Sequence, residues 1–155
     1  MRPSFTGLIL VALIGALAVW TWWRPFGDPV RFTLEAPPVL TLVPRAQQLS
    51  LPLVLHLDNA SRQPQVLLSP DCRPFRWLIL GERAQFVQSQ SAPARCAADE
   101  ALPPLELAAG ERYSERQLVT LKLSRYRADA TYRIRVRFWG MEREARFQLI
   151  AAEPR

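Results

Sequence analysis

Histidine, lysine and glycine are scarce in this chain. His56 is the only histidine, Lys122 is the only lysine, and six glycines are spread over 155 residues. One histidine cannot form the clusters that bind zinc or copper, and six glycines without a Gly-x-x-x-x-Gly-Lys motif exclude a phosphate-binding loop. No Gly-x-Ser-x-Gly turn places a nucleophile beside His56. We therefore expect a non-enzyme without cofactor or metal, and an ordinary His56 on the outer face of a strand.

Cysteine is also rare. The two cysteines, Cys72 and Cys96, lack Cys-x-x-Cys spacing. Such a pair is typical of one disulfide in an oxidising compartment. The bond would stabilise the fold by on the order of 3 kcal/mol in the chain-entropy model. The alternative is two unpaired buried thiols.

Acidic residues are outnumbered by basic ones, 14 against 20, which gives a net charge of +6. All but one of the basic residues are arginine. Codon usage in a GC-rich genome explains this bias, but a basic surface also suits anionic lipid headgroups or an acidic protein partner. No basic helix, zinc pattern or RNA-binding aromatic motif accompanies the charge, so we expect no nucleic-acid partner.

Charge is absent from one long segment, Phe5 to Trp23. As a helix it would be about 28 Å long, which matches the hydrocarbon core of a bilayer. Its last residues fit an aromatic belt at the membrane interface, and they are Trp20, Trp22 and Trp23. We predict an uncleaved signal anchor. Cleavage after the small-x-small sequence Ala16-Leu17-Ala18 is the alternative.

The anchor and the cysteine pair together predict the location of the protein. A single span with a disulfide on one side favours an N-terminus in the cytoplasm and a domain in the periplasm, tethered to the inner (cytoplasmic) membrane. We expect an anchor at 1–23, a Pro-rich linker with a short strand at 24–38, and one domain at 39–155. About 120 residues suffice for one core and not for two.

Beyond the anchor, apolar and polar residues alternate in short runs. In the clearest run, 48–58, five leucines face one way and His56 the other, which predicts a half-buried strand. Pro52 places this strand at an edge or a bulge, because proline lacks a ladder N–H. Asp-Asn-Ala-Ser at 58–61 predicts a turn closed by Asx-type hydrogen bonds. Further runs predict strands over 31–35, 39–43, 66–69, 75–80, 84–88 and 113–123.

The last predicted hairpin carries a basic face. Apolar residues alternate with Arg133, Arg135 and Arg137, so one face packs and the other is solvated. We expect Gly140 and Met141 to form the two-residue turn. The resulting register pairs Val136 with Ala145, Ile134 with Phe147, Tyr132 with Leu149, Arg137 with Glu144 and Arg135 with Arg146. The basic face and the tip residues Trp139 and Met141 are our candidate interaction surface.

About eight short strands with close turns indicate an all-β fold, an antiparallel β-sandwich of immunoglobulin-like architecture. Three phrases resemble bacterial Ig-like domains, including the intracellular proteinase-inhibitor-like family of bacilli. They are Leu-x-Leu-x-Asn-x-Ser at 55–61, Leu-x-Leu-Ala-Ala-Gly-Glu at 105–111 and Thr-Tyr-Arg-Ile-Arg-Val at 131–136. The resemblance spans roughly 49–149 and implies the fold far more than an activity.

Two functions are compatible with these features. The first is an accessory, assembly or interaction subunit of a membrane protein complex, with the lipid bilayer and a protein as partners. The alternative is a proteinase-inhibitor-like or ligand-binding module that presents the polar stretch 89–104 to an enzyme.

Overall fold

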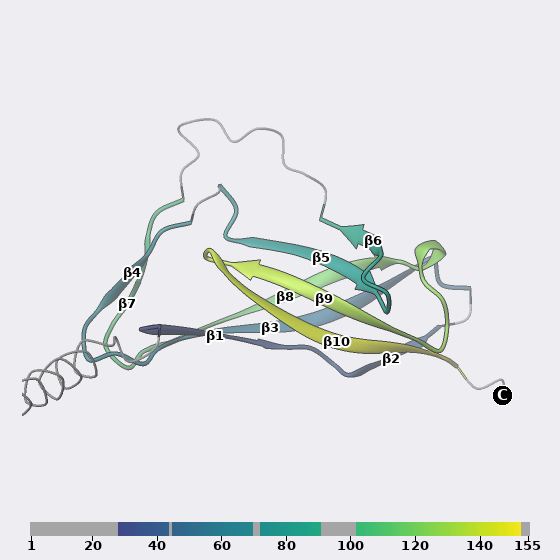
Figure 1. Ribbon diagram of the computed structural model, residues 1–155, viewed down its shortest axis with the longest axis horizontal. Coiled ribbons are helices and arrows are strands. Elements are labelled where there is room, and N and C mark those ends of the chain that lie inside the picture. The colour runs from purple at the N-terminus through teal and green to yellow at the C-terminus, as the bar shows by residue number, and fades with distance from the viewer. Residues whose placement is uncertain (1–27, 44, 70–71, 91–101, 153–155) are drawn as a thin grey trace, which may run out of the picture.

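The computed structural model describes residues 28–43, 45–69, 72–90 and 102–152 (Figure 1). The predicted anchor lies outside these residues, and so do its three tryptophans, the Ala16-Leu17-Ala18 sequence and Cys96. Within the described ranges, no helix is long and apolar enough to cross a membrane.

The described chain is all-β, as the alternation predicted. One short 3-10 helix, η1 (Leu123–Arg125), interrupts a series of strands. The strands are β1 (Val30–Glu35), β2 (Val39–Leu42), β3 (Gln48–Asn59), β4 (Gln65–Leu67), β5 (Phe75–Gly81), β6 (Phe86–Ser89), β7 (Leu105–Leu107), β8 (Arg112–Lys122), β9 (Ala130–Phe138) and β10 (Met141–Ala151).

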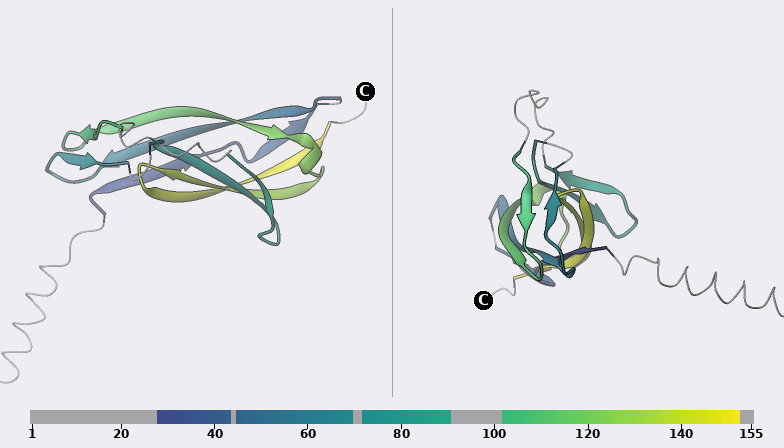
Figure 2. Two further views of the ribbon diagram at one scale, coloured as in Figure 1. Left: turned by 90° about the horizontal axis from the view of Figure 1, so that it is seen from above. Right: turned by 90° about the vertical axis from the view of Figure 1, so that its left-hand side faces the viewer.

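The strands form two main sheets and a ribbon. One sheet has the order β1-β3-β8, and the other has the order β2-β10-β9-β5-β6. Neighbours are antiparallel except β2 and β10, which are parallel. The pair β4-β7 makes a separate two-stranded ribbon at one end of the molecule (Figure 1). Seen end-on, the strands of the two sheets surround a common interior (Figure 2, right), an arrangement consistent with a β-sandwich.

The core is built from the inward residues of both sheets. The leucines of β3 alternate into it, with Leu51, Leu55 and Leu57 fully buried. The facing sheet contributes Ile134 and Phe138 from β9, together with Phe75, Ile79, Val136, Phe147 and Leu149 from the same sheet. Apolar burial on this scale is the main favourable term in the stability of such a domain.

Two features extend or refine the predicted boundaries. Val30 and Phe32 of β1 are buried in the core, so the folded unit includes β1 rather than starting at residue 39. Pro52 lies in β3, the central strand of its sheet, but β1 accompanies β3 only from Val54 to Asn59. Pro52 therefore sits where β3 is locally an edge, which explains why the missing N–H is tolerated.

The register predicted for the last hairpin is wrong by two residues. Trp139 and Gly140 form the turn, both with positive φ (46° and 82°), so the turn is of the I′ type rather than one beginning at Gly140. The observed pairs include Val136 with Arg143, Ile134 with Ala145, Tyr132 with Phe147, Arg137 with Glu142, Arg135 with Glu144 and Arg133 with Arg146. A shift of two preserves the faces, since side chains alternate with period two. Only the cross-strand partners change.

Three buried polar groups tie the loops to the sheets. The amide of Asn59 donates toward the carbonyls of Gln63, Leu107 and Ala108 at 2.8, 3.1 and 2.8 Å, and its oxygen accepts from Ser61. At the other end of β8, the Gln88 amide donates to the Thr120 carbonyl (2.8 Å) and accepts from the Lys122 N–H (3.0 Å). The Tyr132 hydroxyl accepts from the Arg127 N–H at 2.7 Å. These bonds fix the corners of the sandwich.

Candidate functional site

The outer face of β5, β9 and β10 carries the arginines that the sequence singled out. Arg133, Arg135 and Arg137 alternate with the buried residues of β9, as predicted. Arg76 on β5 is paired with Arg137, and Arg146 on β10 with Arg133. Five arginines and two glutamates, Glu142 and Glu144, therefore share one sheet surface, which we call the arginine face.

Carboxylates neutralise part of the arginine face. Glu144 contacts Arg133 (3.3 Å) and Arg135 (3.5 Å), and Glu142 contacts Arg135 (3.3 Å). We expected Arg135 to oppose Arg146, and the corrected register gives it Glu144 instead. Within the described chain no carboxylate pairs with Arg137 or Arg146. Arg137 and Arg146 therefore carry positive charge that these contacts do not offset.

The hairpin tip is only partly exposed. Trp139 and Met141 are half-buried and pack against the core cluster. The backbone N–H of Trp139 donates to the Pro74 carbonyl at 2.9 Å, which holds the turn against the start of β5. The tip is thus a structural closure of the hairpin, and only part of each side chain is available for a contact.

Cys72 is disulfide-bonded in the structure, and the described residues include no free cysteine. Cys96 lies outside the described residues, so its pairing with Cys72 stays a prediction. Most of the 89–104 stretch that the inhibitor-like alternative requires lies outside them as well.

A chain of polar side chains on the opposite sheet was not foreseen. His56 is on the outer face of β3, as expected, and its Nδ1 lies 2.8 Å from the Ser114 hydroxyl on β8. Its Nε2 lies 3.4 Å from a carboxylate oxygen of Glu35 on β1. The three residue types match a hydrolytic triad. The group lies on an open sheet surface, however, and Glu35 and Ser114 are exposed, so we interpret it as a cross-strand hydrogen-bond ladder.

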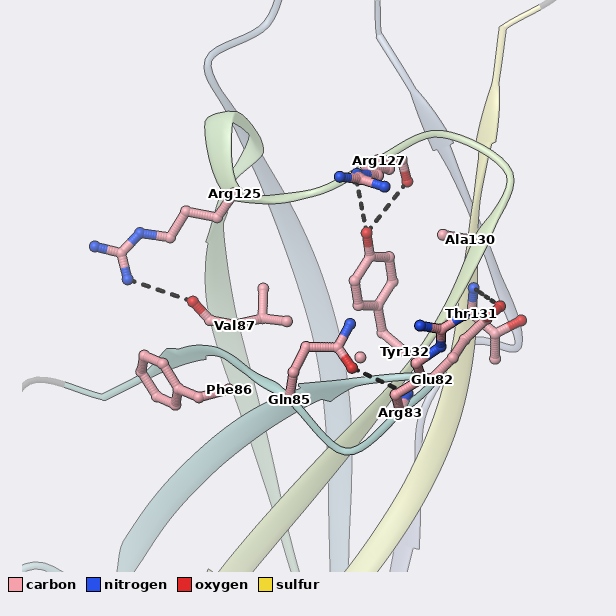
Figure 3. A pocket seen from close by; sticks show the side chains of 11 residues that line it. Glu82, Arg83, Gln85, Phe86, Val87, Arg125, Arg127, Ala130, Thr131 and Tyr132 are labelled. Atoms are coloured by element: carbon pink, nitrogen blue, oxygen red, sulfur yellow. Dashed lines mark hydrogen bonds between the residues drawn. The ribbon is translucent and has the colours of Figure 1, made fainter.

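An open hollow of about 640 Å³ lies between the β5–β6 turn and the segment that joins η1 to β9 (Figure 3). Arg83, Arg125 and Arg127 line it together with Glu82. Arg125 donates to the Val87 carbonyl at 3.4 Å, so one guanidinium is already partly engaged. The guanidinium groups of this lining suit a small anion or a carboxylate.

No family model and no curated protein matches this chain. Solved structures with a distant likeness include the alkylpurine DNA glycosylase AlkC of Pseudomonas fluorescens, with 18% identity and a TM-score of 0.47 over 81% of this chain and 31% of that one. A structural-genomics target, SoR45, has 10% identity and a TM-score of 0.46 over 80% of this chain and 89% of that one. A FixG-related protein from Vibrio parahaemolyticus has 13% identity and a TM-score of 0.37 over 79% and 97%. The chain thus spans about a third of the glycosylase, and these likenesses carry no argument about activity or partners.

Proposed function

We propose that this chain is a non-enzymatic, membrane-anchored interaction subunit whose Ig-like domain lies in the periplasm and binds an acidic surface of a membrane protein complex. The observation that carries the proposal is the arginine face. It is a sheet surface with excess positive charge, on a domain expected to stand close to a bilayer. Arg137 and Arg146 are exposed on it, and the other three arginines are half-buried.

Sheet topology and one corner support the Ig-like assignment. The order β1-β3-β8 against β2-β10-β9-β5-β6, with β2 parallel to β10, matches a sandwich in which a first strand is split between two sheets. Tyr132, near the start of β9, bonds through its hydroxyl to the backbone of Arg127 five residues upstream. A tyrosine in this position closes the same corner of many Ig-like domains. Ile134, two residues later and fully buried, occupies the place of the core cysteine of antibody domains.

The partner chemistry follows from the charges. Arg137 and Arg146 lack a carboxylate partner among the described residues, and an exposed guanidinium binds a partner carboxylate with two parallel hydrogen bonds. Electrostatic complementarity of this kind mainly raises the association rate and is weakened by salt. An acidic protein surface satisfies it, and anionic headgroups are the competing possibility.

The test compares two charge-changing variants of the full chain, purified from its own membranes in mild detergent. Changing Arg137 and Arg146 to Gln should release the co-purifying complex at low salt, as high salt releases it from the parent. The matched control, Glu142→Gln, should retain the complex because it adds net positive charge to the same face. Equal retention in all three proteins would refute the role of the arginine face. Binding of the parent to phosphatidylglycerol vesicles alone, with no protein recovered, would assign the face to lipid.

The location has a separate test. Alkylation of the native protein without reductant should label neither Cys72 nor Cys96, and mass analysis of the membrane-derived chain should find residues before Val19. Labelling of both thiols would remove the support for an oxidising compartment. A chain that starts at Val19 would show that the Ala16-Leu17-Ala18 site is cut.

A further inference from the structure

The free edge of β8 is a second candidate binding surface. β8 is hydrogen-bonded to β3 on one side only, and it runs along the margin of the molecule when seen from above (Figure 2, left). An edge strand of 11 residues is long for a domain of this size, since strands average about five or six. Such an edge offers a row of unpaired backbone groups to another chain.

Gln88 shows which backbone groups face outward. Its amide bonds to the Thr120 carbonyl and the Lys122 N–H, so the even-numbered residues of β8 direct their N–H and C=O groups to the free edge. The register with β3 is unbroken along β8, and the same parity therefore extends to Ser114, Arg116 and Leu118. Apart from the residues that the structure leaves undescribed, nothing hydrogen-bonds to the backbone groups of these three residues.

Gln88 also limits the open part of the edge. Its amide already bonds to the Thr120 carbonyl and the Lys122 N–H. These two backbone groups are therefore not available to an added strand. The hydroxyl of Tyr126 donates to Gln88 at 3.1 Å, and burial raises the pKa of Tyr126, so this donor keeps its proton. The free edge thus has a defined end at Thr120 and an open segment from Ser114 to Leu118.

The side chains of the open segment select the occupant. Arg116 is exposed and has no carboxylate partner among the described residues, and Leu118 is 72% exposed. In the antiparallel register that sets Arg116 opposite its own equivalent, a second copy is disfavoured by the two like charges. On the inward side, Glu115 accepts from the Tyr113 hydroxyl at 3.0 Å. A carboxylate of the occupant is therefore favoured on the outward side only.

We propose that the edge of β8 between Ser114 and Leu118 binds an extended, acidic segment of a partner protein as an added β-strand. The segment would run antiparallel, with a carboxylate opposite Arg116 and an apolar side chain opposite Leu118. Backbone hydrogen bonds supply the affinity and the alternate side chains supply the selection, as in other complexes formed by strand addition. This surface is separate from the arginine face, and neither proposal depends on the other.

The probe is a synthetic peptide, acetyl-Thr-Val-Thr-Glu-Thr-Ser-Thr-amide, added to the full chain in detergent micelles. Amide hydrogen exchange at Ser114, Arg116 and Leu118 should slow by at least about tenfold at saturation, because edge amides open to water exchange far faster than paired ones. Two peptides are controls. One has Lys in place of Glu, and the other is methylated on the Glu backbone nitrogen, which keeps the charge and removes the backbone bond. Both should lose the protection.

Two protein variants complete the design. Arg116→Glu should weaken binding of the probe by about tenfold or more. Leu118→Pro removes an edge N–H that β3 does not use, and Leu118→Thr is its matched control with the N–H intact. Only the proline variant should lose protection at the remaining edge amides. If that variant fails to fold, the methylated peptide makes the same test.

Three results would overturn the proposal. Equal protection by the methylated peptide would mean that charge alone attracts the probe. Equal protection by the lysine peptide would exclude an acidic occupant. A concentration-dependent dimer of the parent that Leu118→Pro abolishes would identify a second copy as the occupant instead.

Discussion

The two ends of β8 are held by buried amides that work differently. Asn59, 2% exposed, closes a corner near Arg112 and satisfies carbonyls from two loops. Gln88, 6% exposed, lies near Lys122 and bridges the edge of β8 to β6 of the other sheet. One amide fills the inside of a turn, whereas the other replaces a missing strand.

The two amides differ in whether water can replace their hydrogen bonds. The carbonyls around Asn59 lie inside a corner, and losing the amide leaves buried acceptors unpaired, which costs the full desolvation of each group. The groups that Gln88 bonds lie on a strand edge, where water can enter once the amide is gone. We therefore expect the Asn59 corner to contribute more to stability, and the Gln88 bridge more to the definition of the free edge.

The largest effect is expected at Asn59. Asn59→Ala should lower the free energy of unfolding by about 2–4 kcal/mol, because it leaves several buried carbonyls without a hydrogen-bond donor. Urea unfolding of the full chain in detergent measures it through the midpoint at unchanged slope. Asn59→Asp is the sharper variant. It keeps the acceptor for Ser61 but faces the carbonyls with a charge, and it should be at least as damaging as alanine. A loss below about 1 kcal/mol for both would break the comparison, since a buried unsatisfied group costs about that much or more.

A smaller effect is expected at Gln88. Gln88→Leu keeps the volume and removes three hydrogen bonds, and we expect a loss of about 1–2 kcal/mol, since water can solvate the opened edge. The same variant lengthens the free edge to Lys122, so amide exchange at Lys122 should accelerate more than the global stability change explains. An unchanged exchange rate at Lys122 would show that Gln88 does not cover the edge.

The sequence predicted the Asx turn of Asn59 with Ser61, but neither the bonds of Asn59 to Leu107 and Ala108 nor the Gln88 bridge, for a physical reason. Asn59 and Ser61 lie within one turn, and short polar side chains at such positions bond to the local backbone. Gln88 and Thr120 are 32 positions apart, and His56 and Ser114 are 58 apart. The alternation of apolar and polar residues does not indicate which strands become neighbours in a sheet. The all-β class, the faces of β3 and β9 and the outward arginines followed from the period of two alone.

The hairpin register failed for a related reason. The turn was assigned from the preference of glycine for its first central position, yet Trp139 adopts the positive φ that places Gly140 second. A bulky residue is rarely found there, and packing of the tip against the core accompanies it here. The predicted register paired Arg137 with Glu144 and Arg135 with Arg146, whereas the structure pairs Arg137 with Glu142 and Arg135 with Glu144. The charge balance of the arginine face therefore needed the structure.

Tyr132 should give a third, smaller effect at the same end of β8 as Gln88. Tyr132→Phe removes the hydroxyl that bonds the Arg127 backbone at 2.7 Å and leaves the ring stacked on Phe147 at 5.7 Å. We expect a loss of about 1 kcal/mol, the net value of one hydrogen bond. Tyr132→Leu, which also removes the ring contacts, should cost clearly more. Equal losses for the two variants would mean that the corner bond carries the whole contribution of this residue.

The smallest effect is expected where polar groups are close but exposed. Ser114→Ala breaks the 2.8 Å bond to His56, and both partners can then bind water. We expect a change in the free energy of unfolding within about 0.5 kcal/mol, as for surface substitutions in general. His56→Gln, which keeps a polar partner for Ser114, should be equally mild. We attribute the larger effect of Asn59 to its lack of solvent access rather than to its number of hydrogen bonds, since exposed polar groups are normally satisfied by water. A loss above about 1.5 kcal/mol from Ser114→Ala would contradict this explanation. It would also require the Glu35–His56–Ser114 chain to be treated as a structural element of the sheet rather than a surface ladder.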